Sequence, residues 1–138
     1  MNLQTLKLKK IRLRDTDATG VLYFTEQLRM ALEALEDCFS LKEMIERESF
    51  LMPIVHAEAD YYAPLKVGDE VEISISCGKI GETSFSLNYR FFDPERQSVV
   101  GNVTIVHVTV SKTTKKPTPI PPPVKTFLQA LPKLSDPA

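Results

Sequence analysis

The chain has 138 residues, which suits one domain with its own core and is too short for two independent domains. Its composition is 43% hydrophobic and 25% charged, which excludes a largely disordered chain. Seventeen basic and eighteen acidic residues give a net charge of −1, so no overall field attracts nucleic acid or an anionic membrane. We therefore expect a single domain over residues 1–138, with neither nucleic acid nor membrane as a partner.

The cysteine pattern and the N-terminal sequence bear on the compartment. Cys38 and Cys77 lie in apolar periodic stretches without CxxC spacing, and we interpret them as free buried thiols. The first ten residues lack the apolar core of a signal peptide, and no segment has the length of a membrane span. These observations favour a cytoplasmic protein, although a mature protein whose leader had been removed would show the same pattern.

The hydrophobic period changes once in the first half of the chain. Residues 5–14 place apolar side chains at every second position, which predicts a strand. A helical spacing follows and predicts one long helix. Its expected apolar stripe consists of Phe24, Leu28, Ala31, Leu32, Leu35 and Phe39. Ser40 and Glu43 have capping-box spacing and predict a second, short helix that ends near residue 48.

After Pro53 the alternation is typical of β structure. The expected strands cover residues 54–62, 70–77, 84–92 and 98–112. The basic and proline-rich sequence that follows predicts an extended arm over about 113–138, within which the apolar residues from Val124 to Leu131 suit a brief helix that docks back. One long helix and five strands predict an α+β fold, in which an antiparallel sheet wraps around the helix.

The segment RDTDATGVLYF, residues 14–24, holds the candidate chemistry. Gly20 permits a turn with positive φ, and the first helical turn around Tyr23 and Phe24 offers backbone N–H groups that can polarise a carbonyl oxygen. A carboxylate upstream can attack the same carbonyl carbon or activate water for that attack. We choose Asp17 for this role.

Two alternative interpretations of the same carboxylates remain open. Aspartates before a helix commonly accept hydrogen bonds from turn or cap donors, so Asp15 and Asp17 can be purely structural. The residues from Asp15 to Glu26 also have the ligand spacing of an EF-hand calcium loop. An EF-hand needs an entering helix, whereas residues 5–14 have a period of two, so we expect no metal and no cofactor.

Two segments resemble a known family. Residues 15–24, DTDATGVLYF, resemble the signature of the 4-hydroxybenzoyl-CoA thioesterase family of hot-dog proteins, in which the second aspartate is catalytic. Residues 54–64, IVHAEADYYAP, followed by residues 67–69, VGD, resemble the second-strand signature of that family. The resemblance extends over residues 8–112. The tail at residues 115–117, KKP, is similar to the branch that hydrolyses 1,4-dihydroxy-2-naphthoyl-CoA in phylloquinone and menaquinone synthesis.

The resemblance implies a hot-dog fold, with a five-stranded antiparallel sheet around one central helix, and an acyl-CoA substrate. It implies that Asp17 acts as nucleophile or general base and that the backbone N–H near Phe24 binds the carbonyl oxygen. It also implies homo-oligomers, namely edge-to-edge dimers commonly paired into tetramers, with active sites at subunit boundaries. Thr19 departs from the pattern, because many relatives have glycine or alanine there. Phe24 stands where the short-acyl branch often has histidine, which favours an aromatic substrate.

Other side chains are weaker candidates. His56 and Glu58, on the expected second strand, are candidates to bind substrate, although a lone strand histidine is more often structural. Another hot-dog branch has its acid on the central helix, but here Glu33 and Glu36 lie off the apolar stripe and are expected to face solvent. The candidates to bind the CoA phosphates, by charge alone, are Lys79, Arg90, Lys112, Lys115 and Lys116.

Three alternative functions remain open. The chain could be a broad-specificity thioesterase for short- or medium-chain acyl-CoA or acyl-ACP. It could instead be a non-catalytic hot-dog protein that binds an acyl ligand, since a fold does not guarantee a reaction. A hot-dog dehydratase would need a histidine with an acidic partner, and His107 has no such motif around it.

Overall fold

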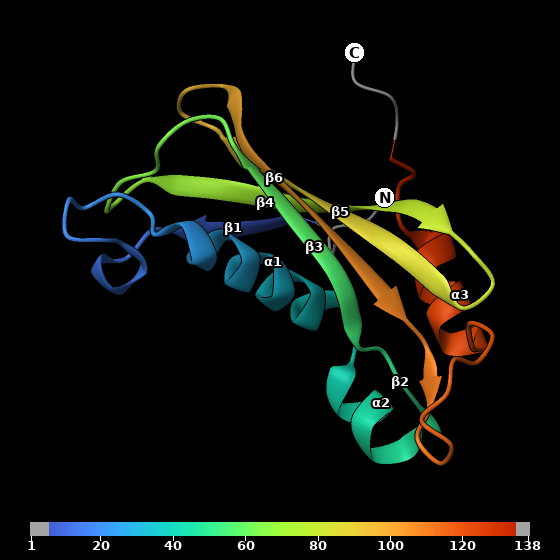
Figure 1. Cartoon of the computed structure of the whole chain (residues 1–138). Helices are drawn as coiled ribbons and strands as arrows, with labels where there is room; N and C mark the ends of the chain where they lie inside the picture. Colours follow the sequence, from blue (N-terminus) through green and yellow to red (C-terminus); the bar gives the residue numbers. More distant parts are fainter. Residues whose placement is uncertain (1–5, 135–138) are drawn as a thin grey trace.

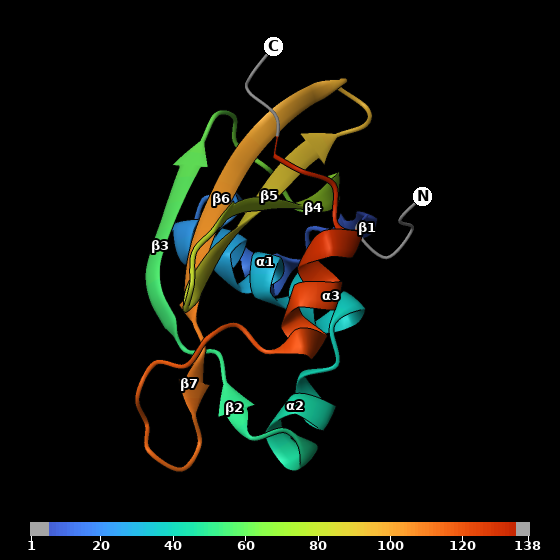
Figure 2. The same cartoon turned by 90° about the vertical axis from the view of Figure 1, so that its right-hand side faces the viewer.

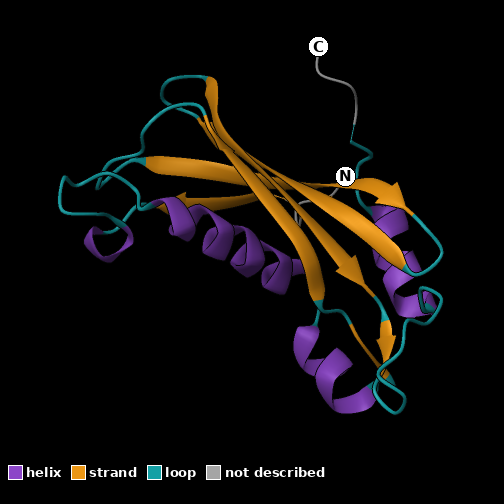
Figure 3. Ribbon diagram, in the orientation of Figure 1, coloured by secondary structure: helices purple, strands orange, loops and turns teal. Residues whose placement is uncertain are grey.

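The computed structural model describes residues 6–134 and is built on a five-stranded antiparallel sheet that curves over one long helix (Figures 1 and 3). The helix is α1 (Phe24–Cys38). In spatial order the strands are β1 (Leu6–Lys10), β4 (Glu70–Ile80), β5 (Ser84–Asp93), β6 (Ser98–Val108) and β3 (Ile54–Tyr61). This arrangement confirms the predicted α+β fold. Thr5 of the expected first strand and residues 135–138 of the expected arm lie outside the described residues.

Alternating sequence explains which face of the sheet is buried. The buried hydrophobic side chains of β4 and β5 are Val71, Ile73, Ile75, Cys77, Phe85, Leu87, Tyr89 and Phe91, as their spacing predicts. Successive side chains of a strand point to opposite faces, so these eight form one apolar surface. α1 packs against that surface and contributes Met30, Ala31, Ala34 and Leu35 to the core.

The prediction for the face of α1 is only partly right. Ala31 and Leu35 are buried, but Phe24 is 59% exposed and Leu32 is 36% exposed. The helix is turned so that the side with Gln27 and Met30 meets the sheet. The described chain therefore buries one flank of the apolar stripe and leaves the other flank uncovered.

The predicted last strand, residues 98–112, is wrong in its last four residues. β6 ends at Val108, and the chain leaves the main sheet as β7 (Val110–Ser111), which pairs with β2 (Phe50–Leu51) (Figure 2). Thr109 marks the break, because its hydroxyl donates to the carbonyl oxygen of Thr118 and its N–H donates to the carbonyl oxygen of Thr83. These bonds tie the chain to two neighbouring segments and turn it out of the sheet.

Three short helical segments complete the fold. They are η2 (Leu13–Asp15), α2 (Leu41–Arg47) and α3 (Pro122–Ala130). The Glu43 N–H donates to the Ser40 hydroxyl at 3.4 Å, as the capping-box spacing suggests. α3 packs on the body of the protein through buried Val124 and Leu128. No helix within residues 6–134 is both long enough and apolar enough to cross a bilayer.

Candidate active site

The loop between η2 and α1 is held in place by backbone hydrogen bonds. Gly20 has a φ of 80°, which glycine adopts without strain. The Asp17 N–H donates to the carbonyl of Val21 at 2.8 Å, and the Leu22 N–H donates to the carbonyl of Leu65 at 2.7 Å. These bonds close the loop on itself and fix it against the segment before β4. The segment that enters the loop contains β1 and η2 and no α-helix, so it lacks the entering helix of an EF-hand.

Asp15 has a structural role in this loop. Its side chain is only 1% exposed, and its two carboxylate oxygens accept from the Arg12 N–H at 2.8 Å and from the Arg29 guanidinium at 2.9 Å. Its carbonyl oxygen accepts from the Tyr23 N–H at 2.9 Å. Asp15 therefore joins the loop to the first turns of α1 and is not available to a substrate.

Asp17 is placed differently, although it lies only two residues away. Its side chain is exposed, and its Oδ1 accepts from the N–H and the hydroxyl of Thr19 at 2.7 and 2.6 Å. The Thr19 hydroxyl bond, and after it the Thr19 backbone bond, lowers the pKa of Asp17 below its ordinary value. Within residues 6–134, Oδ2 has no hydrogen-bond partner. Asp17 is thus an ionised carboxylate with one fixed oxygen and one free oxygen.

The N-terminus of α1 lies directly after this loop. The sequence suggested that the Tyr23 N–H would be free, but it donates to the carbonyl oxygen of Asp15, because the loop folds back onto that residue. The N–H groups of Phe24 and Thr25 have no partner among residues 6–134, and Tyr23 provides no side-chain cap. Two unpaired donors at the positive end of the helix dipole are suited to bind a developing oxyanion.

Two contacts fix this end of α1 against the sheet. The Tyr61 hydroxyl of β3 donates to the carbonyl of Phe24, and the buried amide of Gln27 donates to the carbonyl of Asp60 at 3.1 Å. Gly101 on β6 allows the close approach, because an added Cβ would lie 2.5 Å from the Gln27 Oε1. The unpaired N–H groups are therefore preorganised, as oxyanion stabilisation requires.

His56 and Glu58 do not join this arrangement within one chain. Directly opposite residues of paired strands share a face. His56 and Glu58 pair with Val106 and Thr104, whereas Ala57 pairs with buried Ile105 on the α1 side. His56 and Glu58 consequently lie on the face away from α1, where they approach each other at 3.5 Å with 60% and 65% of their side chains exposed. Their assignment to substrate binding stays a prediction.

The other charged candidates and the cysteines are scattered over the molecule. Glu36 is exposed, but Glu33 is half-buried and pairs with Lys9 at 3.3 Å and with Arg29, so it does not simply face solvent. The candidate cations for the CoA phosphates also lie apart. The Arg90 guanidinium stacks over Phe92, and the Lys112 ammonium donates to the carbonyl of Ile45. Lys79 lines a cavity of about 490 Å³.

The two cysteines, Cys38 and Cys77, are free thiols, and burial raises the pKa of Cys38 to about 11.

A larger cavity, of about 560 Å³, lies at the opposite end of α1 from Asp17. Its lining includes Leu32, α2 and Ile54, together with His107 of β6. Sequence reasoning set His107 aside because no acidic motif surrounds it. The missed signal was its phase on β6, which places it on the same face as buried Val103 and Ile105.

Comparison with known proteins identifies the family. The profile of the thioesterase-like superfamily matches residues 11–128. The chain belongs to this superfamily. Among solved structures, a 1,4-dihydroxy-2-naphthoyl-CoA thioesterase from Synechocystis superposes with a TM-score of 0.84 at 28% identity, over 92% of this chain and 96% of that one. The fold of this thioesterase-like protein is accordingly the hot-dog fold.

Cyanobacterial relatives of this thioesterase-like protein are named for the same substrate. One from Prochlorococcus marinus, named 1,4-dihydroxy-2-naphthoyl-CoA hydrolase, is 34% identical over 120 residues, which are 78% of this chain and 76% of the relative. Another of that name, from Picosynechococcus, is 30% identical over 137 residues, 93% of this chain and 94% of the relative. The family profile, over residues 11–128, spans both the loop that contains Asp17 and the strand that contains His107.

Proposed function

We propose that this protein is an acyl-CoA thioesterase that hydrolyses 1,4-dihydroxy-2-naphthoyl-CoA in phylloquinone or menaquinone synthesis. The observation that carries the proposal is the similarity, at 30–34% identity over most of the chain, to hydrolases named for that substrate. The described structure adds a carboxylate oxygen on Asp17 that has no partner within residues 6–134, and unpaired N–H groups at the N-terminus of the helix that follows the Asp17 loop. Free Cys38 and Cys77 support a reducing compartment, and we place the reaction in the cytoplasm.

The proposed chemistry needs no cofactor. The thioester carbonyl oxygen accepts hydrogen bonds from the N–H groups of Phe24 and Thr25, which makes its carbon electrophilic. The free oxygen of Asp17 either attacks that carbon or removes a proton from the water that does. The C–S bond breaks, the thiolate of CoA takes up a proton, and water supplies the oxygen of the released carboxylate. Asp17 suits both routes, because its lowered pKa keeps it ionised at neutral pH.

We further propose that two chains pair along β3 to form the active unit, and that such dimers pair into tetramers. β3 is an edge strand, and seven of its eight residues are exposed. The uncovered flank of α1, with exposed Phe24 and Leu32, lies on the same side of the sheet. An exposed edge next to an exposed apolar flank is the pattern of a protein–protein contact.

Replacing Asp17 tests the proposal. We expect Asp17→Asn to fold normally and to lower kcat by about a hundredfold or more, because it removes the primary catalytic group. The measurement is release of free CoA thiol from 1,4-dihydroxy-2-naphthoyl-CoA, with benzoyl-CoA and straight-chain acyl-CoA esters as comparison substrates. If the wild type cleaves none of these esters, hydrolysis is excluded, and a binding protein becomes the better description.

Two further variants distinguish a catalytic role of Asp17 from a loss of stability and from catalysis by a carboxylate on α1. Asp15→Asn removes the charge of a buried carboxylate that accepts from the Arg12 N–H and from the partly exposed Arg29, and it should lower the free energy of unfolding by about 1–3 kcal/mol. Asp17→Asn should not show this effect. Glu36→Gln removes the exposed carboxylate that is the nearest equivalent of an acid on the central helix. Full activity of Asp17→Asn together with an inactive Glu36→Gln would move catalysis to the helix and overturn the role of Asp17.

A further inference from the structure

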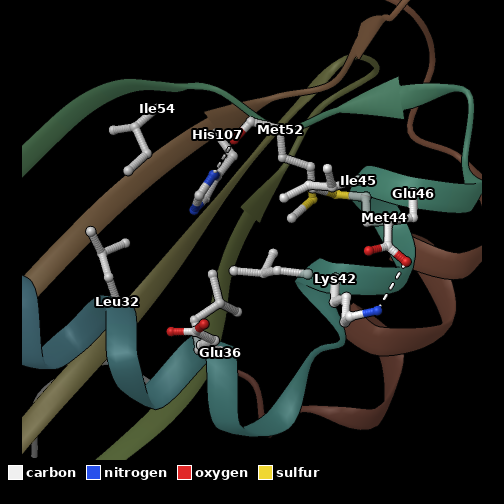
Figure 4. A pocket seen from close by; sticks show the side chains of 11 residues that line it. Leu32, Glu36, Lys42, Met44, Ile45, Glu46, Met52, Ile54 and His107 are labelled. Atoms are coloured by element: carbon white, nitrogen blue, oxygen red, sulfur yellow. Dashed lines mark hydrogen bonds and ion pairs between the residues drawn. The ribbon is translucent and has the colours of Figure 1, made fainter.

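The cavity at the C-terminal end of α1 has a mostly apolar lining, with the charged side chains of Glu36, Lys42 and Glu46 and one buried polar group (Figure 4). It lies between α1, α2 and the adjoining ends of β3 and β6, and its walls include Leu32, Met44, Met52 and Ile54. Its volume of about 560 Å³ lies within the range of small-molecule sites. Its shape and lining are therefore suited to an aromatic ring system.

His107 is the buried polar group, and its surroundings fix its protonation state. The side chain is 3% exposed and stacks on Phe85, with ring centroids 5.3 Å apart and planes 18° apart. Its Nδ1 lies 3.0 Å from the carbonyl oxygen of Met52. A carbonyl oxygen only accepts, so Nδ1 must carry the hydrogen. Burial lowers the pKa of His107 and keeps the ring neutral, which leaves Nε2 without a hydrogen.

Nε2 is an acceptor with nothing to accept from. It is buried and has no hydrogen-bond partner within residues 6–134. In Figure 4 the ring of His107 projects from β6 into the cavity, and its Nε2 points toward the side of α1 that carries Leu32. A buried acceptor without a donor is unfavourable, so a ligand that supplies a hydroxyl in this position would be selected.

We propose that His107 is a specificity-determining residue, whose Nε2 accepts a hydrogen bond from a ring hydroxyl of the aromatic acyl group. The proposal rests on the proposed function and names the feature of the substrate that the site selects. A ring that lacks the hydroxyl still fits the apolar walls, but it leaves Nε2 unpaired. Sites built around a hydrogen bond discriminate strongly against ligands that cannot make it.

Pairing along β3 brings this cavity to the catalytic loop of the other subunit. Tyr61, at one end of β3, is bonded to Phe24 at the N-terminus of α1, while Ile54, at the other end, lines the cavity. Antiparallel self-pairing reverses the two strands and places the Tyr61 end of one protomer beside the Ile54 end of its partner. When Asp17 of one chain acts on the thioester carbonyl, the ring of the acyl group can thus enter the cavity of the other chain.

The test compares hydroxylated and unhydroxylated ligands in two variants of His107. His107→Asn keeps an amide N–H that can reach the carbonyl of Met52, but it has no acceptor at the position of Nε2. His107→Gln offers an oxygen at that position and gives up the Met52 bond. We expect wild type to prefer 1,4-dihydroxy-2-naphthoyl-CoA over 2-naphthoyl-CoA by about tenfold or more in kcat/KM. The preference should disappear in His107→Asn and persist in His107→Gln.

A binding measurement separates this inference from the proposed function. Calorimetric titration of the full-length wild type with 1,4-dihydroxy-2-naphthoate and with 2-naphthoate needs no turnover, and the dihydroxy acid should bind about tenfold more tightly. A wild type that hydrolyses both esters with equal kcat/KM, or a His107→Asn variant that keeps the full preference, would overturn the role of His107 while leaving the thioesterase proposal intact. Selective binding without any hydrolysis would support His107 and overturn the thioesterase.

Discussion

Asp15 and Asp17 show how the surroundings of a residue, and not its type, set its role. Both are aspartates in one short loop, yet Asp15 is 1% exposed with both oxygens bonded, whereas Asp17 is exposed with Oδ2 free. The sequence singled out Asp17 for catalysis, but the spacing of the two carboxylates alone left a purely structural role open for both. The structure makes Asp15 structural, and the chemistry proposed above depends on Asp17 alone.

The Thr19 hydroxyl should set the acid limb of the pH profile. It stabilises the charged form of Asp17, so Thr19→Val should raise the pKa of Asp17 toward its ordinary value while keeping the backbone N–H bond. A base with a higher pKa becomes protonated sooner as the pH falls. The acid limb of kcat/KM should therefore move to higher pH, which initial rates across a pH series would measure.

Thr16→Val is the matched control for this experiment. The Thr16 hydroxyl donates to the carbonyl of Leu13 and touches no carboxylate, so its loss should leave the acid limb in place. An identical shift in both variants would mean that the loop has changed its conformation. No shift in Thr19→Val would mean that another group controls the limb.

The face of the sheet on which each side chain lies was predictable where the alternation is regular. The prediction failed where the backbone departs from that alternation. The inward residues of β4 and β5 follow directly from a period of two. In β3 a register shift between Ile54 and His56 changes which face each residue occupies, so that Ile54 lines the α1 side and His56 does not. Nothing in the local sequence marks that bulge, because it arises from the pairing of β3 with β6.

At the scale of elements, the five strands of the main sheet and the long helix were predictable, but the small β2–β7 pair and the rotation of α1 were not. Hydrophobic spacing finds a stripe without saying which part of it a sheet will cover. The close approach of α1 to β6 at Gly101 turns polar Gln27 inward, where its amide bonds the carbonyl of Asp60. The sequence gives no sign that a glutamine lies in the core, since burial of its amide depends on an acceptor from a distant strand.

Gly101→Ala should therefore loosen the packing of α1 on the sheet. The added Cβ would lie 2.5 Å from Oε1 and 2.9 Å from Nε2 of Gln27, so the amide must move and lose its bond to Asp60. We expect a loss of about 1–3 kcal/mol in the free energy of unfolding, measured by urea denaturation. The same substitution in a Gln27→Ala background should cost much less, because the clash is gone. Equal losses in both backgrounds would place the strain elsewhere.

At the scale of the whole molecule, an exposed edge strand and half of an apolar helix stripe lie side by side. The edge strand β3 has a register shift and two acidic residues, Glu58 and Asp60, which are features that shield strand edges. It nevertheless exposes apolar side chains, since Ile54, Val55 and Tyr61 are 44%, 58% and 46% exposed. Ala57, in the middle of β3, is exposed as well. In an antiparallel pair of identical strands, a residue near the middle lies close to its own copy.

Ala57→Lys should consequently separate the proposed dimer. Two lysines near the two-fold axis would face each other across the strand pair, and like charges in such positions are destabilising. Thr126→Lys is the matched control, because Thr126 is exposed on α3, away from this edge. Light scattering at micromolar concentration should show an assembly for wild type and for Thr126→Lys but a single chain of 15.5 kDa for Ala57→Lys.

The activity of that monomer tests the shared active site. If the monomer loses thioester hydrolysis but keeps the thermal unfolding transition of the wild type, the cavity of one chain binds the substrate on which Asp17 of the other chain acts. A fully active monomer would restrict catalysis to groups within one chain.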